Sequence, residues 1–454
     1  MLKFTLFIAL ATVVYADYER TLSAELDPFC EPSAKCGLCY VQAEGPSDTV
    51  HHLWATFGSP AMLNVHTRPG VRLLNVSWHH LRKRDISVAA FRFSEAPIVS
   101  SAVVLSKLWE YKDVGNMAKV DPHLANGTHS VSLGDLVWGD VSGCEGNGSD
   151  VVVATFTANS STSKDDAVYF SKDGTVQVTV RVQSASGRQD QLPHLLYTSN
   201  STQLEVSLLG LATKLGDDSQ FGLELTALDE SPANWTLTVD QRSSFDDEYT
   251  PGVFTNVAVV PRGNASLTLP TYLHWKPVSY RDARRTVTLS VDANNQNLTS
   301  GAGWWRFNAA TAWMAHRAPN VSSTALNLTL GSEGDGHYKK YHYATWSVSA
   351  GFGSLPVEQV STTVIAVTSV GLGIPAIVVD RHGGLPRSVQ ARTKSLAVDL
   401  DLSLGYGLYR RSLPHQRARA LHSEWPKARS VLLSPVFHFK LFDVQSLPFH
   451  HNHE

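Results

Sequence analysis

The chain has 454 residues, a formal net charge of −3, 43% hydrophobic residues and 17% charged residues. This composition is typical of a globular protein and excludes a largely disordered chain. The small negative net charge gives no support to a nucleic-acid-binding function.

The first 16 residues have the features of a secretory signal peptide. Lys3 supplies a positive charge, an apolar run covers residues 4–14, and the segment ends in the small residue Ala16. The apolar run is shorter than the roughly 20 residues that cross a bilayer, so we expect cleavage after Ala16 rather than a membrane anchor. A buried N-terminal helix is the alternative. Residues 1–16 are therefore left out of the predicted fold.

Four cysteines are too few to hold a chain of this length together, so hydrophobic burial must supply most of the stability. Cys30, Cys36 and Cys39 lie close together, and Cys144 lies far from them in the sequence. The first three resemble half of a zinc site, and Cys36 with Cys39 has the spacing of a redox pair, but a secretory compartment favours disulfides. We predict two structural disulfides, one of which joins Cys144 to the N-terminal cluster. Three connectivities remain open.

Residues 17–356 show mainly the pattern of short β-strands. Runs rich in Val, Thr and Leu are separated by turn-forming residues, and no long amphipathic helix is predicted between residues 50 and 350. The clearest predicted strands are residues 151–157, 175–182, 204–209, 235–239, 253–260 and 286–291. The pattern predicts an all-β region with one or two antiparallel β-sandwiches. If there are two, the boundary is expected in the polar stretch near 184–195.

The densest acidic motif is Asp246, Asp247 and Glu248, followed by Tyr249. Adjacent carboxylates suit Ca²⁺ binding or acid–base catalysis, but successive residues of an extended chain point to opposite faces. We therefore expect a structural turn or a partner contact here. His51 and His52 are adjacent in the sequence, so on a strand they would also point to opposite faces and could not bind one metal ion together. The local motifs of common hydrolases and nucleotide-binding enzymes are missing from the sequence, and we predict no catalytic residue, cofactor or metal ligand.

Sequons for N-glycosylation are unusually frequent. With 17 asparagines, and with serine and threonine at 80 of the 454 positions, about three sequons would arise by chance. The ten that are present begin at Asn75, Asn126, Asn147, Asn159, Asn200, Asn234, Asn264, Asn297, Asn320 and Asn327. This excess predicts a heavily glycosylated region exposed to the secretory lumen.

Residues 359–379 form an uncharged stretch of 21 residues, long enough for a transmembrane helix. A buried pair of strands with a turn near 371–373 is the competing interpretation. All ten sequons precede this stretch, and the tail 380–454 carries 11 Lys and Arg residues, as expected on the cytoplasmic side. We therefore predict a single-pass type I membrane protein with a glycosylated lumenal region over 17–356 and a mostly disordered cytoplasmic tail.

Several segments, in order and at similar spacing, resemble the glycosylated lysosomal membrane protein family. They are residues 132–138, 204–210, 221–224, 246–251, 275–280, 327–331, 342–347 and 351–353, with Pro356. Together they cover roughly residues 50–375. The family pattern is a short tail with a tyrosine-based sorting signal. The tail of this chain is long, and neither Tyr406 nor Tyr409 has the bulky aliphatic residue three positions on that such a signal requires.

The resemblance implies a lysosomal membrane protein that acts as an accessory subunit of a multi-pass major facilitator transporter. The glycosylated lumenal region would shield the lumenal loops of the transporter from lysosomal proteases, and no enzymatic activity is implied. A membrane-anchored lumenal hydrolase and a cell-surface adhesion or receptor glycoprotein are the alternatives. A buried pair of carboxylates about 5 to 10 Å apart in a cleft would favour the hydrolase, and residence at the plasma membrane would favour the receptor.

Overall fold

The computed structural model describes residues 19–367, apart from 33, 87–89, 122, 160–173, 231–234, 244–248, 254, 264–268, 297–305, 318–319, 359–360 and 362. The predicted signal peptide, the tail 380–454 and most of the predicted span 359–379 lie outside the described residues. Within the described ranges, no helix has the length and apolar character needed to span a bilayer.

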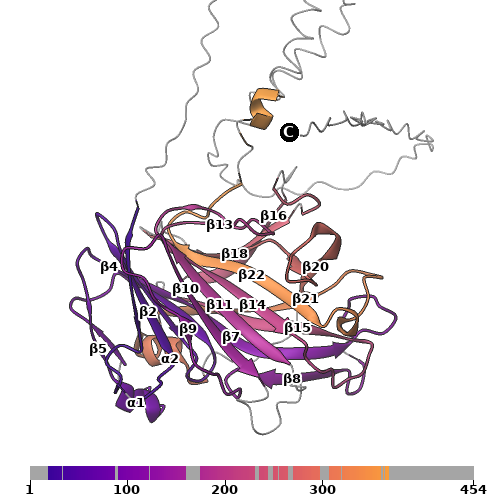
Figure 1. The fold of residues 1–454 in the computed structure, drawn as a ribbon, viewed down its shortest axis with the longest axis horizontal. Helices are drawn as coiled ribbons and strands as arrows, with labels where there is room; N and C mark the ends of the chain where they lie inside the picture. Colours follow the sequence, from indigo (N-terminus) through magenta and orange to yellow (C-terminus); the bar gives the residue numbers. More distant parts are fainter. Residues whose placement is uncertain are drawn as a thin grey trace, which may run out of the picture. The chain divides into compact units, whose positions relative to one another are not determined.

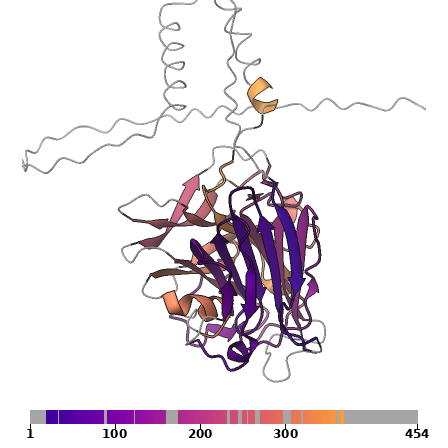
Figure 2. The same ribbon diagram turned by 90° about the vertical axis from the view of Figure 1, so that its left-hand side faces the viewer.

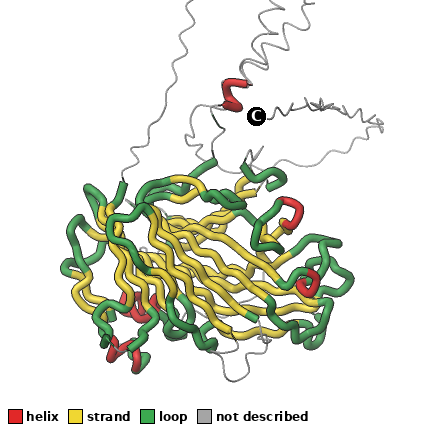
Figure 3. Tube along the Cα trace, in the orientation of Figure 1, coloured by secondary structure: helices red, strands yellow, loops and turns green. Residues whose placement is uncertain are grey.

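Strands dominate the described chain, as Figure 3 shows. The strands are β1 Thr21–Leu26, β2 Leu38–Glu44, β3 Thr49–Ala55, β4 Ala61–Thr67, β5 Leu73–Val76, β6 Phe91–Phe93, β7 Val99–Lys112, β8 Thr128–Ser132, β9 Ser142–Gly143, β10 Val151–Asn159, β11 Thr175–Gln183, β12 Gly187–Arg188, β13 Leu196–Tyr197, β14 Ser201–Leu209, β15 Ser219–Glu230, β16 Thr236–Ser243, β17 Thr255–Arg262, β18 Thr271–Trp275, β19 Val278–Tyr280, β20 Ser290–Gln296, β21 Val321–Leu330 and β22 Tyr343–Phe352. The helical segments are short: α1 Trp78–Arg82, α2 Ala309–Met314, η1 Val287–Leu289, η3 Ala315–Arg317 and η4 Tyr338–Lys340.

The long strands form two antiparallel sheets. The first runs in the order β1, β2, β3, β4, β7, β15, β21, β20, and β8 pairs with the second half of β7. The second runs in the order β9, β10, β11, β14, β22, β18, β17, β16 (Figure 1). Strand β19 pairs with both β22 and β20 and so connects the sheets at one edge.

One hydrophobic core lies between the sheets and takes residues from both. Val41 and Leu225 come from the first sheet, and Phe156, Val206 and Trp346 come from the second. Alternate residues of each strand point inward, which is the burial pattern of a β-sandwich. The predicted all-β class is confirmed. Strands β11 and β14, on either side of residues 184–195, are hydrogen-bonded neighbours in one sheet.

A second hydrophobic core covers the outer face of the first sheet. Leu63 and Val104 point to this side, where they meet Phe91 of β6 and Trp313 of α2. Figure 2 shows α2 against the indigo strands of that sheet. Because both faces are covered here, every residue of β3 and β4 is buried.

A buried ionic cluster joins the two sheets near the start of the described chain. Arg20 donates to Asp48 at 2.8 Å and to the side-chain oxygen of Asn200 at 2.6 Å, and His66 lies 2.7 Å from Asp48. Burial raises the pKa of Asp48, but the hydrogen bonds from His66 and Arg20 outweigh this and hold it at about 2. The carboxylate therefore stays ionised in an acidic compartment.

Most of the predicted strands are present, with ends displaced by a few residues. Residues 286–291 are the exception, because 287–289 form the 3₁₀ turn η1 and strand β20 starts only at Ser290. Thr286, Val287 and Thr288 have strand propensity, but the turn brings β20 beside both β19 and β21. Tertiary pairing has overridden local propensity here.

Candidate functional site

The two disulfides have different positions in the sandwich. Cys30 pairs with Cys36 across a short loop, whereas Cys39 pairs with Cys144 over a sequence separation of 105. Cys39 lies on β2 of the first sheet and Cys144 directly follows β9 of the second, so this bond ties the sheets together through the core. The prediction that Cys144 joins the N-terminal cluster is confirmed.

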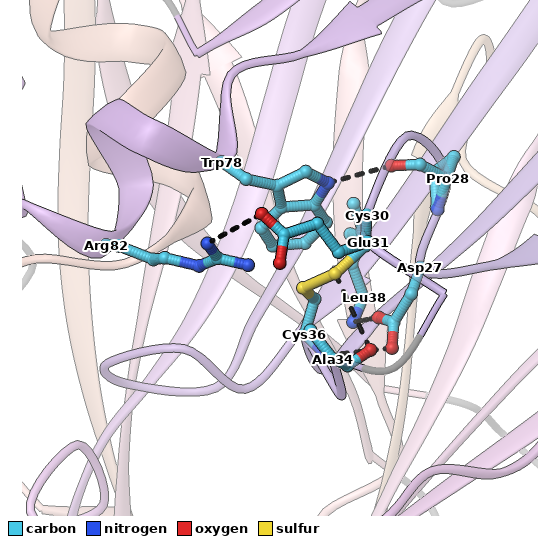
Figure 4. Close-up of a disulfide and its surroundings, with 9 residues drawn as sticks. All are labelled: Asp27, Pro28, Cys30, Glu31, Ala34, Cys36, Leu38, Trp78 and Arg82. Atoms are coloured by element: carbon cyan, nitrogen blue, oxygen red, sulfur yellow. Dashed lines mark hydrogen bonds and ion pairs between the residues drawn. A yellow bond between two sulfur atoms is a disulfide. The ribbon is translucent and has the colours of Figure 1, made fainter.

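The loop closed by Cys30 and Cys36 is held by several further contacts (Figure 4). Both carboxylate oxygens of Asp27 accept backbone N–H groups, from Cys36 at 2.8 Å and Leu38 at 2.7 Å. The indole N–H of Trp78 donates to the Pro28 carbonyl oxygen at 2.9 Å. These contacts indicate a structural role for this disulfide.

His51 and His52 point to opposite faces of β3, as alternation predicts. His51 lies 2.8 Å from the Tyr40 hydroxyl on the outer side, and His52 lies 2.9 Å from Asn64 on the inner side. Both side chains are completely buried. Within the described residues, no cluster of three His, Cys, Asp or Glu side chains is suited to hold a metal ion.

The sequons fall into three groups within the described chain. Exposed asparagines are Asn75, Asn126, Asn147 and Asn320; half-buried ones are Asn159 and Asn200; and Asn327 is buried. Asn234, Asn264 and Asn297 lie outside the described residues. Arg20 donates to the side-chain oxygen of Asn200. A glycan is attached to the side-chain nitrogen, which takes no part in this contact.

Asn327 is the sequon whose position conflicts with a glycan. Its exposed fraction is 4%, and it lies within β21 opposite Glu224 of β15 and Gln296 of β20. Because so little of this side chain is exposed, a glycan attached to it would need space that neighbouring groups occupy. We therefore expect Asn327 to be unmodified in the folded glycoprotein.

Replacing Asn327 by Gln is expected to leave the number of attached glycans unchanged. Asn320→Gln is the matched control, because Asn320 is exposed and immediately precedes the same strand. This control should lower the mass by one glycan, as measured by intact-protein mass spectrometry of the secretory product. A loss of one glycan in Asn327→Gln would contradict the expectation.

A charged cluster fixes the segment that precedes the predicted span. We define the Glu358 cluster as Arg188, Tyr249, Thr250, Lys276 and Glu358. Arg188 and Lys276 contact the two carboxylate oxygens of Glu358 at 2.6 and 3.1 Å. Lys276 also donates to the Thr250 hydroxyl at 2.9 Å, and the Lys276 side chain is only 1% exposed.

Tyr249 and Thr250 connect the acidic motif to this cluster. The Arg188 guanidinium lies 3.6 Å from the centre of the Tyr249 ring, a cation–π contact. The Thr250 hydroxyl donates to the Pro193 carbonyl oxygen at 2.6 Å. Asp246, Asp247 and Glu248 themselves lie outside the described residues, so their predicted role as a turn or partner contact stays a prediction.

A hollow of about 160 Å³ lies next to the Glu358 cluster. Side chains of β13, β16, β17 and β18 line it on one side, and residues 355–358 line it on the other. Figure 1 shows β13 and β16 at the end of the domain opposite to α1. The hollow and the cluster therefore lie where the chain leaves the β-domain.

Comparison with known proteins identifies the family. The family model described as "Glycosylated lysosomal membrane protein" matches residues 37–384, which is more than three quarters of the chain. The chain belongs to the glycosylated lysosomal membrane protein family. The match includes the β-domain from β2 onward and continues through the predicted span.

Individual relatives carry the same family name. The zebrafish (Danio rerio) protein is 29% identical over 413 residues, covering 87% of this chain and 97% of the relative. The bovine (Bos taurus) protein is 28% identical over 361 residues, with coverage of 77% and 83%. The human protein is 27% identical over 363 residues, with coverage of 77% and 82%. These names designate membrane glycoproteins of the lysosome rather than enzymes.

Sequence reasoning found only part of the Glu358 cluster in this family member. Tyr249 and Lys276 lie in segments that resemble the family, and Glu358 directly precedes the predicted span. Arg188 lies in the polar stretch 184–195, where the sequence indicates only a possible boundary. These residues are brought together by pairing between distant strands, and no local pattern contains that information.

Proposed function

We propose that this lysosomal membrane glycoprotein is a non-enzymatic accessory subunit of a multi-pass major facilitator transporter. In this role its glycosylated β-domain covers the lumenal loops of the transporter and keeps proteases away from them, which also maintains the transporter in the lysosomal membrane. The family membership supports the compartment. The sandwich, with both long sheets sharing one core, supports protease resistance, because tightly hydrogen-bonded strands offer few flexible sites for cleavage.

The Glu358 cluster is the observation that carries this proposal. Glu358 is held by Arg188 and Lys276, and the predicted span starts at the next residue. A domain on a flexible linker would sample many orientations above the membrane. Glu358 is fixed on the β-domain and directly precedes the predicted span, so in this proposal the short connection keeps the domain beside the span. A neighbouring multi-pass protein would have its lumenal loops in that area.

The test is to purify the full chain from lysosomal membranes in mild detergent and to identify its stoichiometric companions by mass spectrometry. A major facilitator transporter recovered near one-to-one, and lost from lysosomes when this protein is depleted, is the expected result. Recovery of this protein alone, with transporter levels unchanged on depletion, would overturn the proposal.

Glu358→Gln is expected to destabilise the β-domain by about 2 kcal/mol, because it removes charge-assisted hydrogen bonds to Arg188 and to the buried Lys276. Chemical unfolding of the purified glycoprotein measures this loss. Asp282→Asn is the control, since the Asp282 pair with Arg284 is at the surface and its loss should be small. An equal loss of unfolding free energy in both variants would show that the ion pairs of Glu358 stabilise the β-domain no more than a surface ion pair does.

A flexible Gly-Ser insertion after Glu358 distinguishes the stability of the β-domain from its orientation relative to the predicted span. The insertion leaves every contact of the Glu358 cluster in place, so the unfolding midpoint of the β-domain should not change. Protection of the transporter loops against added protease should nevertheless fall. Unchanged protection would show that the domain shields its partner without a fixed attachment to the span.

A further inference from the structure

A basic patch lies on α1 and on the two short strands beside it. It consists of the exposed residues Arg72, Arg82, Lys83, Arg84 and Arg92. Residues 72–93 contain these five cations and one acidic residue, Asp85, and so carry a formal charge of +4. Because the whole chain carries −3, the remaining residues carry −7. Positive charge is therefore concentrated on one small part of an otherwise acidic protein, around the projecting α1 in Figure 1.

The turn that carries the basic residues 82–84 is fixed to the β-domain. Trp78 and Leu81 of α1 are buried in the second hydrophobic core. The indole N–H of Trp78 also donates to a backbone carbonyl oxygen at 2.9 Å (Figure 4). The backbone N–H of Ser77 donates to the Ala90 carbonyl oxygen at 2.7 Å, which holds the start of α1 beside β6. A rigid backbone therefore presents the cations, which lowers the entropy cost of binding a partner.

Neighbouring carboxylates leave most of the patch without an ion pair. Two of its arginines form exposed pairs with N···O distances of 3.7 and 3.9 Å, and pairs of this kind contribute little. Among the residues that the structure describes, no ion pair includes Lys83, Arg84 or Arg92. The undescribed residues 87–89 are Ser, Val and Ala, so they supply no charge. The patch therefore keeps its positive charge for an anionic partner.

The chemistry of the patch suits a sulfated polymer. Consecutive basic residues such as 82–84 are typical of surfaces that bind heparin. Four of the five cations are arginines, whose guanidinium groups donate two parallel hydrogen bonds to tetrahedral oxyanions such as phosphate and sulfate. A repeating polyanion can contact several of these cations at once, so weak individual contacts together give measurable affinity.

The sequon at Asn75 argues against a membrane surface as the partner. Asn75 is exposed and lies opposite Arg92 in the pairing of β5 with β6, so the two side chains share one face. A glycan on Asn75 would hold a flat bilayer away from the patch, whereas an extended polysaccharide can lie beside it. We propose that the basic patch binds a sulfated polysaccharide of the glycosaminoglycan class. This interaction goes beyond the proposed transporter partnership and does not depend on it.

The test measures the binding of heparin fragments to the full-length glycoprotein in non-ionic detergent, by isothermal titration calorimetry at several salt concentrations. The α1 variant combines Arg82→Gln, Lys83→Gln and Arg84→Gln. It is expected to raise the dissociation constant about ten-fold, because three exposed ionic contacts are lost together. The slope of log affinity against log salt concentration should become shallower by about two, as expected when a linear polyanion loses three contacts.

The control variant removes the same charge elsewhere on the surface. Its three substitutions replace exposed cations that are each paired with an aspartate, namely Arg262→Gln, Arg284→Gln and Lys339→Gln. The control should leave the dissociation constant unchanged. Arg92→Gln, a single change outside α1, should raise it about two-fold. The unfolding midpoints of all three variants should stay close to that of the wild type, because the replaced side chains are exposed.

Four results would overturn the proposal. An unchanged dissociation constant in the α1 variant would show that the patch is not the binding surface. An equal loss of affinity in the control variant would show only a general attraction between the polyanion and surface cations. Equally tight binding of desulfated heparin would show that sulfate groups are not recognised. Tighter binding to phosphatidylserine vesicles than to heparin, lost in the α1 variant, would assign the patch to a membrane surface instead.

Discussion

Lowering the pH from about 7.5 to about 4.5 is expected to reduce the free energy of unfolding of this protein by on the order of 5 kcal/mol. Three buried histidines cause the loss. Burial lowers the pKa of His51 and His52 to about 3 and that of His274 to about 4. In the unfolded chain each histidine has a pKa near 6.5. Below pH 6.5 the unfolded chain therefore binds protons that the folded chain excludes, and stability falls with the pH.

Two buried carboxyl groups act in the opposite direction, because burial raises the pKa of both Asp229 and Glu224. The contribution of Asp229 is included in this sum. Burial raises the pKa of Asp229 to about 6, so the folded chain takes up a proton before the unfolded chain does, and stability increases by about 2 kcal/mol at pH 4.5. Asp48 changes little over this range. Its contribution to stability begins to fall only near pH 4, where the unfolded carboxyl takes up a proton, and is lost as the pH approaches its folded-state pKa of about 2.

Urea unfolding followed by tryptophan fluorescence, repeated across this pH range, measures the loss. His52→Gln should flatten the pH profile, because it removes one of the three histidines that protonate only on unfolding. His79→Gln is the control, since His79 is exposed on α1. A midpoint that stays constant or rises on acidification would contradict the prediction. If it holds, disulfides, glycans or a bound partner must supply the stability that this fold loses in an acidic lysosome.

Removing the Cys39–Cys144 disulfide by replacing both residues with Ala is expected to destabilise the protein by about 4 to 5 kcal/mol. The bond closes a loop with a sequence separation of 105, so its loss greatly increases the entropy of the unfolded chain. It also crosses the core between the two sheets, where Cys39 and Cys144 are both buried. The two sheets would then be held together mainly by hydrophobic packing.

The Cys30–Cys36 disulfide provides a matched control within the same protein. Its sequence separation is only 6, and the same reasoning gives an effect below about 3 kcal/mol for the double Ala variant. Chemical unfolding of both variants, with glycosylation checked by mass, measures the difference. Equal losses from the two variants would show that loop length and the position between the sheets do not determine the contribution of these bonds.

The sequence by itself determined the properties that depend on local patterns. Short runs of β-branched residues were sufficient to predict the all-β class, because strand periodicity is a property of neighbouring residues. The opposite orientation of His51 and His52 followed from the same alternation. Motif spacing was sufficient to indicate the glycosylated lysosomal membrane protein family, because relatives preserve the order of such segments.

Only the tertiary structure decided which distant residues meet. Cysteine spacing left three connectivities open, and the packing of β2 in the first sheet against the segment that follows β9 in the second sheet selects Cys39 for the long-range bond. The sequon at Asn327 has the same sequence pattern as the other nine, but the Asn327 side chain is buried within the sheet that contains β21. The contact of Arg188 and Lys276 with Glu358 depends on chain segments more than 80 residues apart. Alternation specifies the face of a strand that a residue occupies, but the partner across that face is set by the packing of the whole sandwich.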